Sequence, residues 1–163
     1  MIGEAIEQYK DTMSRLLQKL SNFSQKQINK VPYADSWTPG EVADHVLKSQ
    51  YGLPNVLKGS AKPANRKPDE KEGSIKQAFL DFTTKLNSPA FILPTNDPVD
   101  KTAIINSLSN KSADIIATFQ SLDPTEECLD FELPVLGVFT RLEWLYFATY
   151  HTQRHIWQLS KMQ

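Results

Sequence analysis

The sequence has a single cysteine, Cys128, which excludes an internal disulfide and a cysteine-based zinc cluster. Acidic residues at positions 126, 127 and 130 disfavour a thiolate, so we expect this thiol to be inert. The chain also lacks a run of about 20 apolar residues, the length that a helix needs to cross a bilayer. Its first residues carry charge and contain no apolar stretch typical of a secretory signal. We therefore expect a cytoplasmic protein with no membrane partner.

Clusters of basic side chains are absent as well. The chain has 18 lysines and arginines against 19 acidic residues, which gives a net charge of -1. No Lys/Arg run is long enough to neutralise many phosphates, and binding to nucleic acid depends mainly on such contacts. We therefore do not expect nucleic acid as a partner.

Apolar residues are present in the amount and spacing of a helical protein. They make up 40% of the 163 positions, enough for one continuous core, and we expect a single domain over residues 1–163. They recur at three- and four-residue spacings, which is typical of amphipathic helices. The expected helices cover residues 2–29, 39–57, 98–122 and 140 onward. The sequence thus predicts an all-α fold, a four-helix bundle with long crossover connections.

Two of these helices have well-marked starts. Residues 38–41 (Thr-Pro-Gly-Glu) and 140–143 (Thr-Arg-Leu-Glu) each place threonine at the N-cap and glutamate three residues later, the pattern of a capping box. The proline of the first segment occupies the first helical position, where it is favoured. The segment Gly52–Pro54 should kink or shorten the helix that begins at residue 39.

The long connection in the middle of the chain is harder to assign. Residues 59–73 hold two prolines and dense charge, so we expect them to be exposed. A short helical pattern follows over residues 75–86. In the turn-rich stretch after it, Phe91, Ile92 and Leu93 are expected to anchor the crossover to the core.

The three histidines form the most informative pattern. His151 and His155 are four residues apart on the last predicted helix, so their rings lie on one face, one turn apart, and can converge on a single ion. His45 lies on the second helix, on the side occupied by Val42, Val46 and Ser49, and so can face the interior of the bundle. Three histidines from two helices match the ligand count of a catalytic zinc-type site with an open fourth position. The alternative is that each histidine is a hydrogen-bonded core residue, or that the last pair faces solvent near a helix end.

Other candidates for chemistry near these histidines are Glu41, Arg154 and Gln158. Glu41 precedes His45 by one turn and could accept its ring N–H, although the capping box also uses its carboxylate. Arg154 and Gln158 lie within a turn of the histidine pair and could contact a substrate. Asp44 is turned about 100° away from His45, and we expect it to be solvated.

Two segments together resemble a known family. The run W-T-P-G-E-V-A-D-H-V at 37–46, followed by E-W-L-Y-F-A-T-Y-H-T-Q-R-H-I at 143–156, is similar to the DinB/YfiT-like superfamily of metalloenzymes. The likeness covers most of the chain, and all three ligand positions are occupied. It implies a bundle of up-down-down-up connectivity, a nickel or zinc ion held by His45, His151 and His155, and frequently a homodimer. Related activities are thiol S-transfer and thiol-dependent maleylpyruvate isomerisation; the long excursion at 59–97 departs from the plainest members.

The ligand set also limits the chemistry. A divalent ion held by three neutral imidazoles can lower the pKa of bound water or bind a thiol as its thiolate. We therefore expect a metal-dependent hydrolase or a low-molecular-weight-thiol S-transferase that acts on a small molecule. No carboxylate base stands beside the histidine pair as it does in H-E-x-x-H, so a noncatalytic metal- or ligand-binding bundle remains the alternative.

Overall fold

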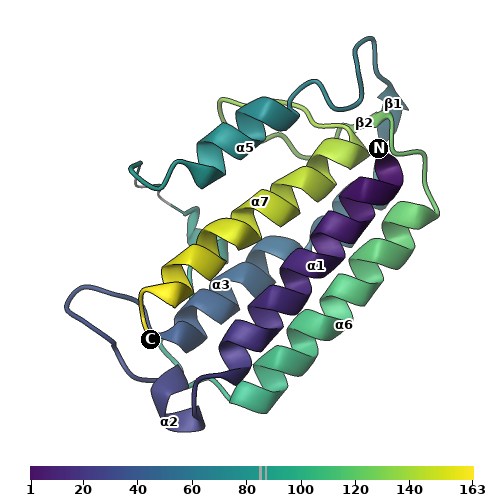
Figure 1. Cartoon of the computed structure of the whole chain (residues 1–163). Helices are drawn as coiled ribbons and strands as arrows, with labels where there is room; N and C mark the ends of the chain where they lie inside the picture. Colours follow the sequence, from purple (N-terminus) through teal and green to yellow (C-terminus); the bar gives the residue numbers. More distant parts are fainter. Residues whose placement is uncertain (85, 87) are drawn as a thin grey trace.

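Four long helices form the body of the computed structural model, which describes residues 1–84, 86 and 88–163 (Figure 1). They are α1 (Ile2–Ser21), α3 (Pro39–Tyr51), α6 (Lys101–Gln120) and α7 (Arg141–Ser160). Helices α1 and α3 each pack against both α6 and α7, which closes the bundle around one core. The predicted all-α four-helix bundle is confirmed, and its up-down-down-up connectivity stays a prediction.

Shorter elements occupy the connections between these helices. They are α2 (Gln25–Ile28), α4 (Leu53–Lys58), α5 (Glu72–Leu80), the 3-10 helix η1 (Ala90–Ile92) and two strands, β1 (Ala61–Pro63) and β2 (Glu126–Cys128). The strands pair antiparallel, so the connection after α4 is joined to the connection after α6. Every helix within the described ranges is too short or too polar to traverse a bilayer.

The bounds of the helices differ from the prediction in two places and agree with it in a third. The helix expected over 2–29 is two helices, because Ser24 accepts a hydrogen bond from the backbone of Gln27 and caps α2 separately. The helix expected over 98–122 begins later, where the Asp100 side chain caps it. The break expected in the second helix is present at Gly52, between α3 and α4.

Both predicted capping boxes are present. The Thr38 hydroxyl accepts from Glu41 N at 3.0 Å, and Glu41 Oε1 accepts from Thr38 N at 2.9 Å. Thr140 and Glu143 make the same reciprocal pair, at 3.1 and 2.9 Å. Because each box satisfies otherwise unpaired N–H groups of the first turn, it fixes where the helix starts. The starts of the two helices that carry the histidines are therefore set by local sequence.

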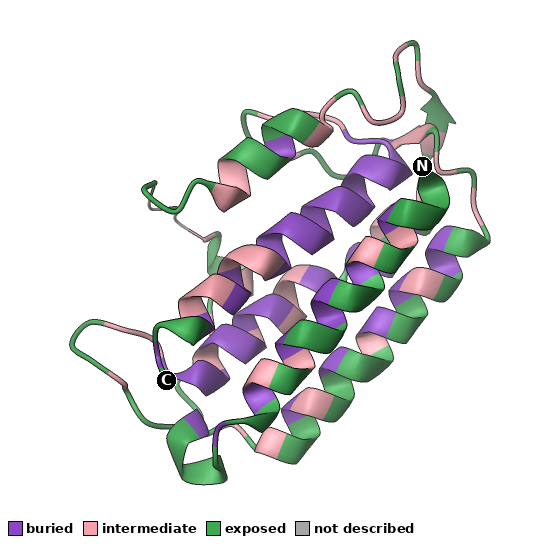
Figure 2. Ribbon diagram, viewed as in Figure 1, coloured by how far each residue is buried: buried purple, intermediate pink, exposed green. Residues whose placement is uncertain are grey.

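Helix α7 is the central helix of the bundle. Figure 2 shows it buried along most of its length, whereas α1 and α6 each leave one face exposed. A buried polar chain holds it to its neighbours: Tyr9 donates to Gln50 Oε1 at 2.7 Å, and the Gln50 amide donates to Thr152 at 2.9 Å. These bonds join α1, α3 and α7 one residue away from His151. They help to fix the position of α3 along the axis of α7.

The segment 59–73 is only partly the exposed excursion that its composition predicted, since about half of its residues are exposed and the others are half-buried. The Arg66 guanidinium donates to both carboxylate oxygens of Glu143, at 2.8 and 2.7 Å, and the Glu143 side chain is fully buried. Lys71 N also donates to Glu143 at 2.7 Å. A charged residue of the connection is thus part of the buried start of α7.

The apolar anchor predicted at residues 91–93 is also wrong. Phe91 and Leu93 remain 69% and 42% exposed, and η1 has no buried residue. The backbone carbonyls of Ile92 and Leu93 join this segment to the bundle, because they accept hydrogen bonds from His45 and Lys48 of α3. This segment is therefore held mainly by polar interactions.

The buried Cys128 thiol should be nearly unreactive in the folded protein. Burial raises its pKa to about 11, so roughly 0.1% is thiolate at pH 8. We expect native protein to react with a disulfide reagent such as DTNB orders of magnitude more slowly than guanidinium-unfolded protein, which should release one equivalent. Rapid labelling of native protein at pH 8 would contradict the burial of this residue.

Candidate metal centre

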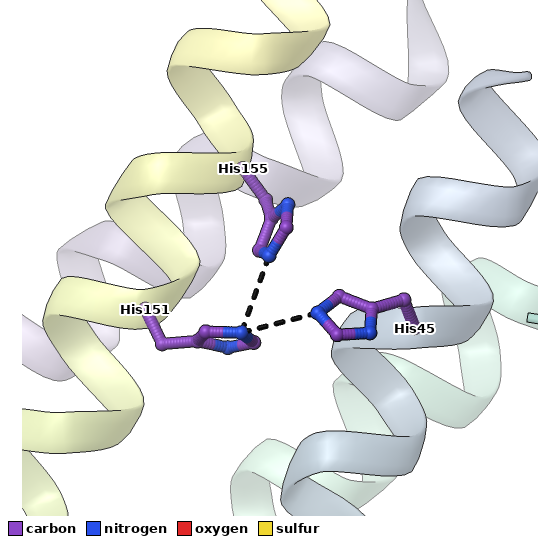
Figure 3. A group of neighbouring side chains, drawn as sticks. All are labelled: His45, His151 and His155. Carbon is purple, nitrogen blue, oxygen red and sulfur yellow. Dashed lines mark hydrogen bonds between the residues drawn. The ribbon is translucent and has the colours of Figure 1, made fainter. Parts of the chain in front are cut away.

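The structure brings together the three histidines that the sequence singled out (Figure 3). His151 Nε2 lies 3.1 Å from His45 Nε2 and 3.2 Å from His155 Nε2. His45 comes from α3 and the other two from adjacent turns of α7, and all three side chains are buried. Two helices far apart in sequence therefore place three imidazole nitrogens around one point.

These separations suit a metal ion. Zinc binds imidazole nitrogen at about 2.0–2.1 Å, so two tetrahedral ligand nitrogens lie about 3.3–3.4 Å apart. The observed 3.1 and 3.2 Å need only a few tenths of an ångström of adjustment. The residues present thus fit a divalent transition-metal ion.

In His45 and His155, the second ring nitrogen, Nδ1, has a hydrogen-bond acceptor outside the cluster. His45 Nδ1–H donates to the Ile92 carbonyl at 2.7 Å, and His155 Nδ1–H donates to Gln158 Oε1 at 2.7 Å. A carbonyl oxygen can only accept, so the proton of each neutral ring is on Nδ1. The lone pair of each ring is therefore on Nε2, the atom that faces the other histidines.

His151 has the same arrangement through a hydroxyl. Ser49 Oγ donates its one hydrogen to the Val46 carbonyl at 2.7 Å, which leaves its lone pairs to accept from His151 Nδ1–H at 3.4 Å. With the His151 proton on Nδ1, all three Nε2 atoms can offer a lone pair to one cation.

Burial keeps the three rings neutral. Desolvation lowers the pKa of His45, lowers the pKa of His151 well below its usual range, and lowers the pKa of His155 to about 3. The neighbouring imidazoles add to the effect at His151 and His155, since a second positive charge is unfavourable beside the first. At neutral pH all three rings are thus neutral, the charge state that metal binding requires.

Aromatic rings form the walls around the histidines. The Trp37 ring centroid lies 5.2 Å from that of His45, and Phe79 and Phe147 each lie 5.5 Å from His151. Such walls exclude water and lower the local dielectric constant, which strengthens electrostatic interactions at the centre.

The remaining candidates have different positions. Gln158 Oε1 accepts from His155 Nδ1–H, and its contact with a substrate stays a prediction. Glu41 is engaged in its capping box, where its carboxylate accepts from Thr38 N. Arg154 donates to the backbone carbonyls of Phe79, Asp81 and Thr84 and so holds the chain after α5 against α7.

Two groups at this centre were not predicted, namely Ser49 and the Ile92 carbonyl. Ser49 lies one turn after His45, on the predicted inward side of the helix, so its spacing was the available signal. A backbone carbonyl has no signal in the sequence. Asp44, expected to be solvated, instead accepts from Thr95 N at 3.0 Å and pairs with Lys48 at 3.1 Å.

Known proteins resemble the chain over nearly its full length. A family model described as the DinB superfamily matches residues 8–159. The uncharacterized protein YuaE of Bacillus subtilis (strain 168) is 28% identical over 150 residues, which cover 89% of this chain and 88% of YuaE. Among solved structures, YfiT from Bacillus subtilis has a TM-score of 0.64 at 17% identity, over 99% of this chain and 85% of YfiT. YfiT is described as a probable metal-dependent hydrolase with an unusual four-helix bundle topology. At that identity the likeness establishes a shared fold.

Proposed function

The chain belongs to the DinB superfamily, and from this premise we propose that it is a metal-dependent enzyme, a hydrolase that acts on a small molecule. The observation that carries the proposal is the meeting of three Nε2 atoms from His45, His151 and His155 in a buried, aromatic-walled site. The description of the structural neighbour YfiT as a probable metal-dependent hydrolase supports the same choice.

The ligand set indicates what the centre would do. A divalent ion bound there would keep its full charge and would lower the pKa of a coordinated water, or hold a thiol as its thiolate. The chain's own residues supply orientation: the Ile92 carbonyl and Gln158 hold His45 and His155 through their Nδ1–H groups. The aromatic walls formed by Trp37, Phe79 and Phe147 limit access of bulk water.

The nearby carboxylates are already engaged. Glu41 accepts the N–H of its capping box, and Asp44 binds Thr95 N and Lys48. Within the described ranges, no hydrogen bond joins a carboxylate to the three histidines. General-base catalysis by a side chain is therefore not part of the proposal.

Hydrolysis can be tested with untagged protein. The metal-free form and forms loaded with zinc, nickel or cobalt should be assayed on small carboxylic esters, amides and phosphate esters. We expect turnover only in a loaded form, and we expect the His45→Ala variant to lose it. Turnover by metal-free protein, or by the His45→Ala variant, at the rate of metal-loaded wild type would refute a role for the centre.

Thiol S-transfer is the second candidate, because three neutral ligands leave a positive centre that favours an anionic fourth ligand. A low-molecular-weight thiol added to cobalt-loaded protein should then give thiolate-to-cobalt charge-transfer absorption. If the cobalt spectrum responds neither to thiols, nor to carboxylates, nor to a rise in pH that would form hydroxide, the fourth coordination position is closed. That result would favour the noncatalytic metal- or ligand-binding bundle.

Gln158→Ala should weaken metal binding by about 10- to 100-fold, because residues that orient a ligating histidine contribute on this scale. The variant removes the acceptor of His155 Nδ1–H and frees the ring to rotate. Competition with a zinc indicator of known affinity measures the effect. Gln153→Ala is the matched control, since Gln153 lies on the same helix and donates to Thr12 at 3.1 Å instead. Equal affinities of the two variants would contradict the assigned role.

A further inference from the structure

Residues 90–95, called the strap below, lie against α3 beside the histidine centre. Three hydrogen bonds hold the strap there, and all three come from one side of α3. His45 Nδ1–H donates to the Ile92 carbonyl at 2.7 Å, and Lys48 Nζ donates to the Leu93 carbonyl at 2.7 Å.

The third bond lies two residues further along the strap, at Thr95. Asp44 Oδ2 accepts from Thr95 N at 3.0 Å and also pairs with Lys48 Nζ at 3.1 Å. Asp44 and Lys48 thus form one charged unit that binds a backbone N–H and a backbone carbonyl of the strap. Both residues are partly exposed, with side chains 18% and 28% accessible.

Apolar burial contributes little to holding the strap. η1 contains no buried residue, and Phe91 and Leu93 are 69% and 42% exposed. A segment with few buried apolar contacts and partly exposed hydrogen bonds opens at a low free energy compared with the core. His45, in contrast, is 1% exposed, so an ion can reach its Nε2 only if a covering element moves.

We propose that the strap controls exchange at the metal centre, and that it opens by release of its bonds to Asp44 and Lys48. The inference rests on the proposed metal-dependent function. Closure returns the Ile92 carbonyl to His45 Nδ1–H and so places the lone pair of that ring on Nε2. Asp44 and Lys48 are positioning residues in this scheme, because they act on the metal only through the strap.

The test compares the rates and the equilibrium of metal binding. Metal-free wild-type, Lys48→Ala and Asp44→Ala proteins are mixed with Co²⁺ in a stopped-flow instrument, and Co²⁺ is removed from loaded proteins with excess EDTA. We expect both rate constants to rise about tenfold in the two variants, the effect of removing one charge-assisted hydrogen bond. The Kd for Co²⁺ should change by less than about threefold. Association and dissociation both require the strap to open, so a lower barrier to opening raises both rate constants by the same factor. Lys111→Ala is the control, since Lys111 pairs with Asp114 within α6.

The possible outcomes separate the strap from the metal site. If the variants bind stoichiometric Co²⁺ at unchanged rates, the strap does not control exchange, and the proposed metal site stands. A faster dissociation with unchanged association would also overturn it, because the strap would then only stabilise the bound state. Absence of Co²⁺ binding by wild-type protein would refute the proposed function itself.

Discussion

Glu143→Ala is expected to lower the free energy of unfolding by roughly 3–5 kcal/mol, the usual cost of breaking a buried ion pair from one side. The fully buried carboxylate accepts from both terminal nitrogens of Arg66, from Lys71 N and from Thr140 N. The alanine variant would leave an arginine that is 15% exposed without its partner, and two backbone N–H groups without an acceptor. Denaturation in urea, followed by circular dichroism, measures the difference.

Two further variants separate the contributions at this position. Glu143→Gln keeps an amide oxygen for the cap and removes the charge, so we expect a smaller loss than for alanine. Glu70→Ala removes a carboxylate 3.9 Å from Arg66 that is 55% exposed, and it should cost less than about 1 kcal/mol. An alanine variant at 143 within about 1 kcal/mol of wild type would contradict the importance of this buried pair.

The features that the sequence predicted correctly depend on neighbours within one or two turns. Both capping boxes are local patterns, and each is present at its expected residue. The inward side of α1 follows from its spacing, since Tyr9, Met13 and Leu16 are all buried. The spacing of His151 and His155 placed both rings on one face for the same reason.

The features that were missed depend on the packing of distant segments. Arg66 and Glu143 are 77 residues apart, and only the completed bundle brings the connection after α4 to the start of α7. The pairing of β1 with β2 likewise joins residues more than 60 positions apart. In composition, residues 59–73 resemble an exposed loop, because charge alone does not show that one arginine has a buried partner.

The candidate site shows the same division. The three histidines could be selected from the sequence, whereas the acceptors of their Nδ1–H groups depend on how α3, α7 and the strap are placed. The exposed Phe91 and Leu93 show why the strap was misjudged: its backbone carbonyls, rather than its apolar side chains, make the contacts. Hydrogen bonds from side chains to backbone carry no residue-type pattern on the accepting side.

His151→Ala is expected to abolish stable metal binding. His151 Nε2 is the atom closest to both other histidines, at 3.1 and 3.2 Å, so its loss leaves two ligands on different helices. Elemental analysis after dialysis should fall from about one ion per chain to below about 0.1, because two imidazoles alone do not make a three-histidine site. Saturating zinc should raise the unfolding temperature of wild-type protein, since it binds only the folded state, and should leave that of the variant unchanged.

The matched control for this prediction is Ile156→Ala, which opens a cavity in the same helix beside His155 and removes no ligand. That variant should unfold at a lower temperature than wild type. Its free energy of unfolding should fall by about 2–5 kcal/mol, the ordinary cost of a core truncation. It should still retain about one ion per chain and still respond to zinc, because the three nitrogens remain. Loss of metal in both variants would mean that any disturbance of α7 releases the ion. Stoichiometric metal in His151→Ala, with a normal thermal response to zinc, would show that the ion binds elsewhere and that the convergence of the three rings has another cause.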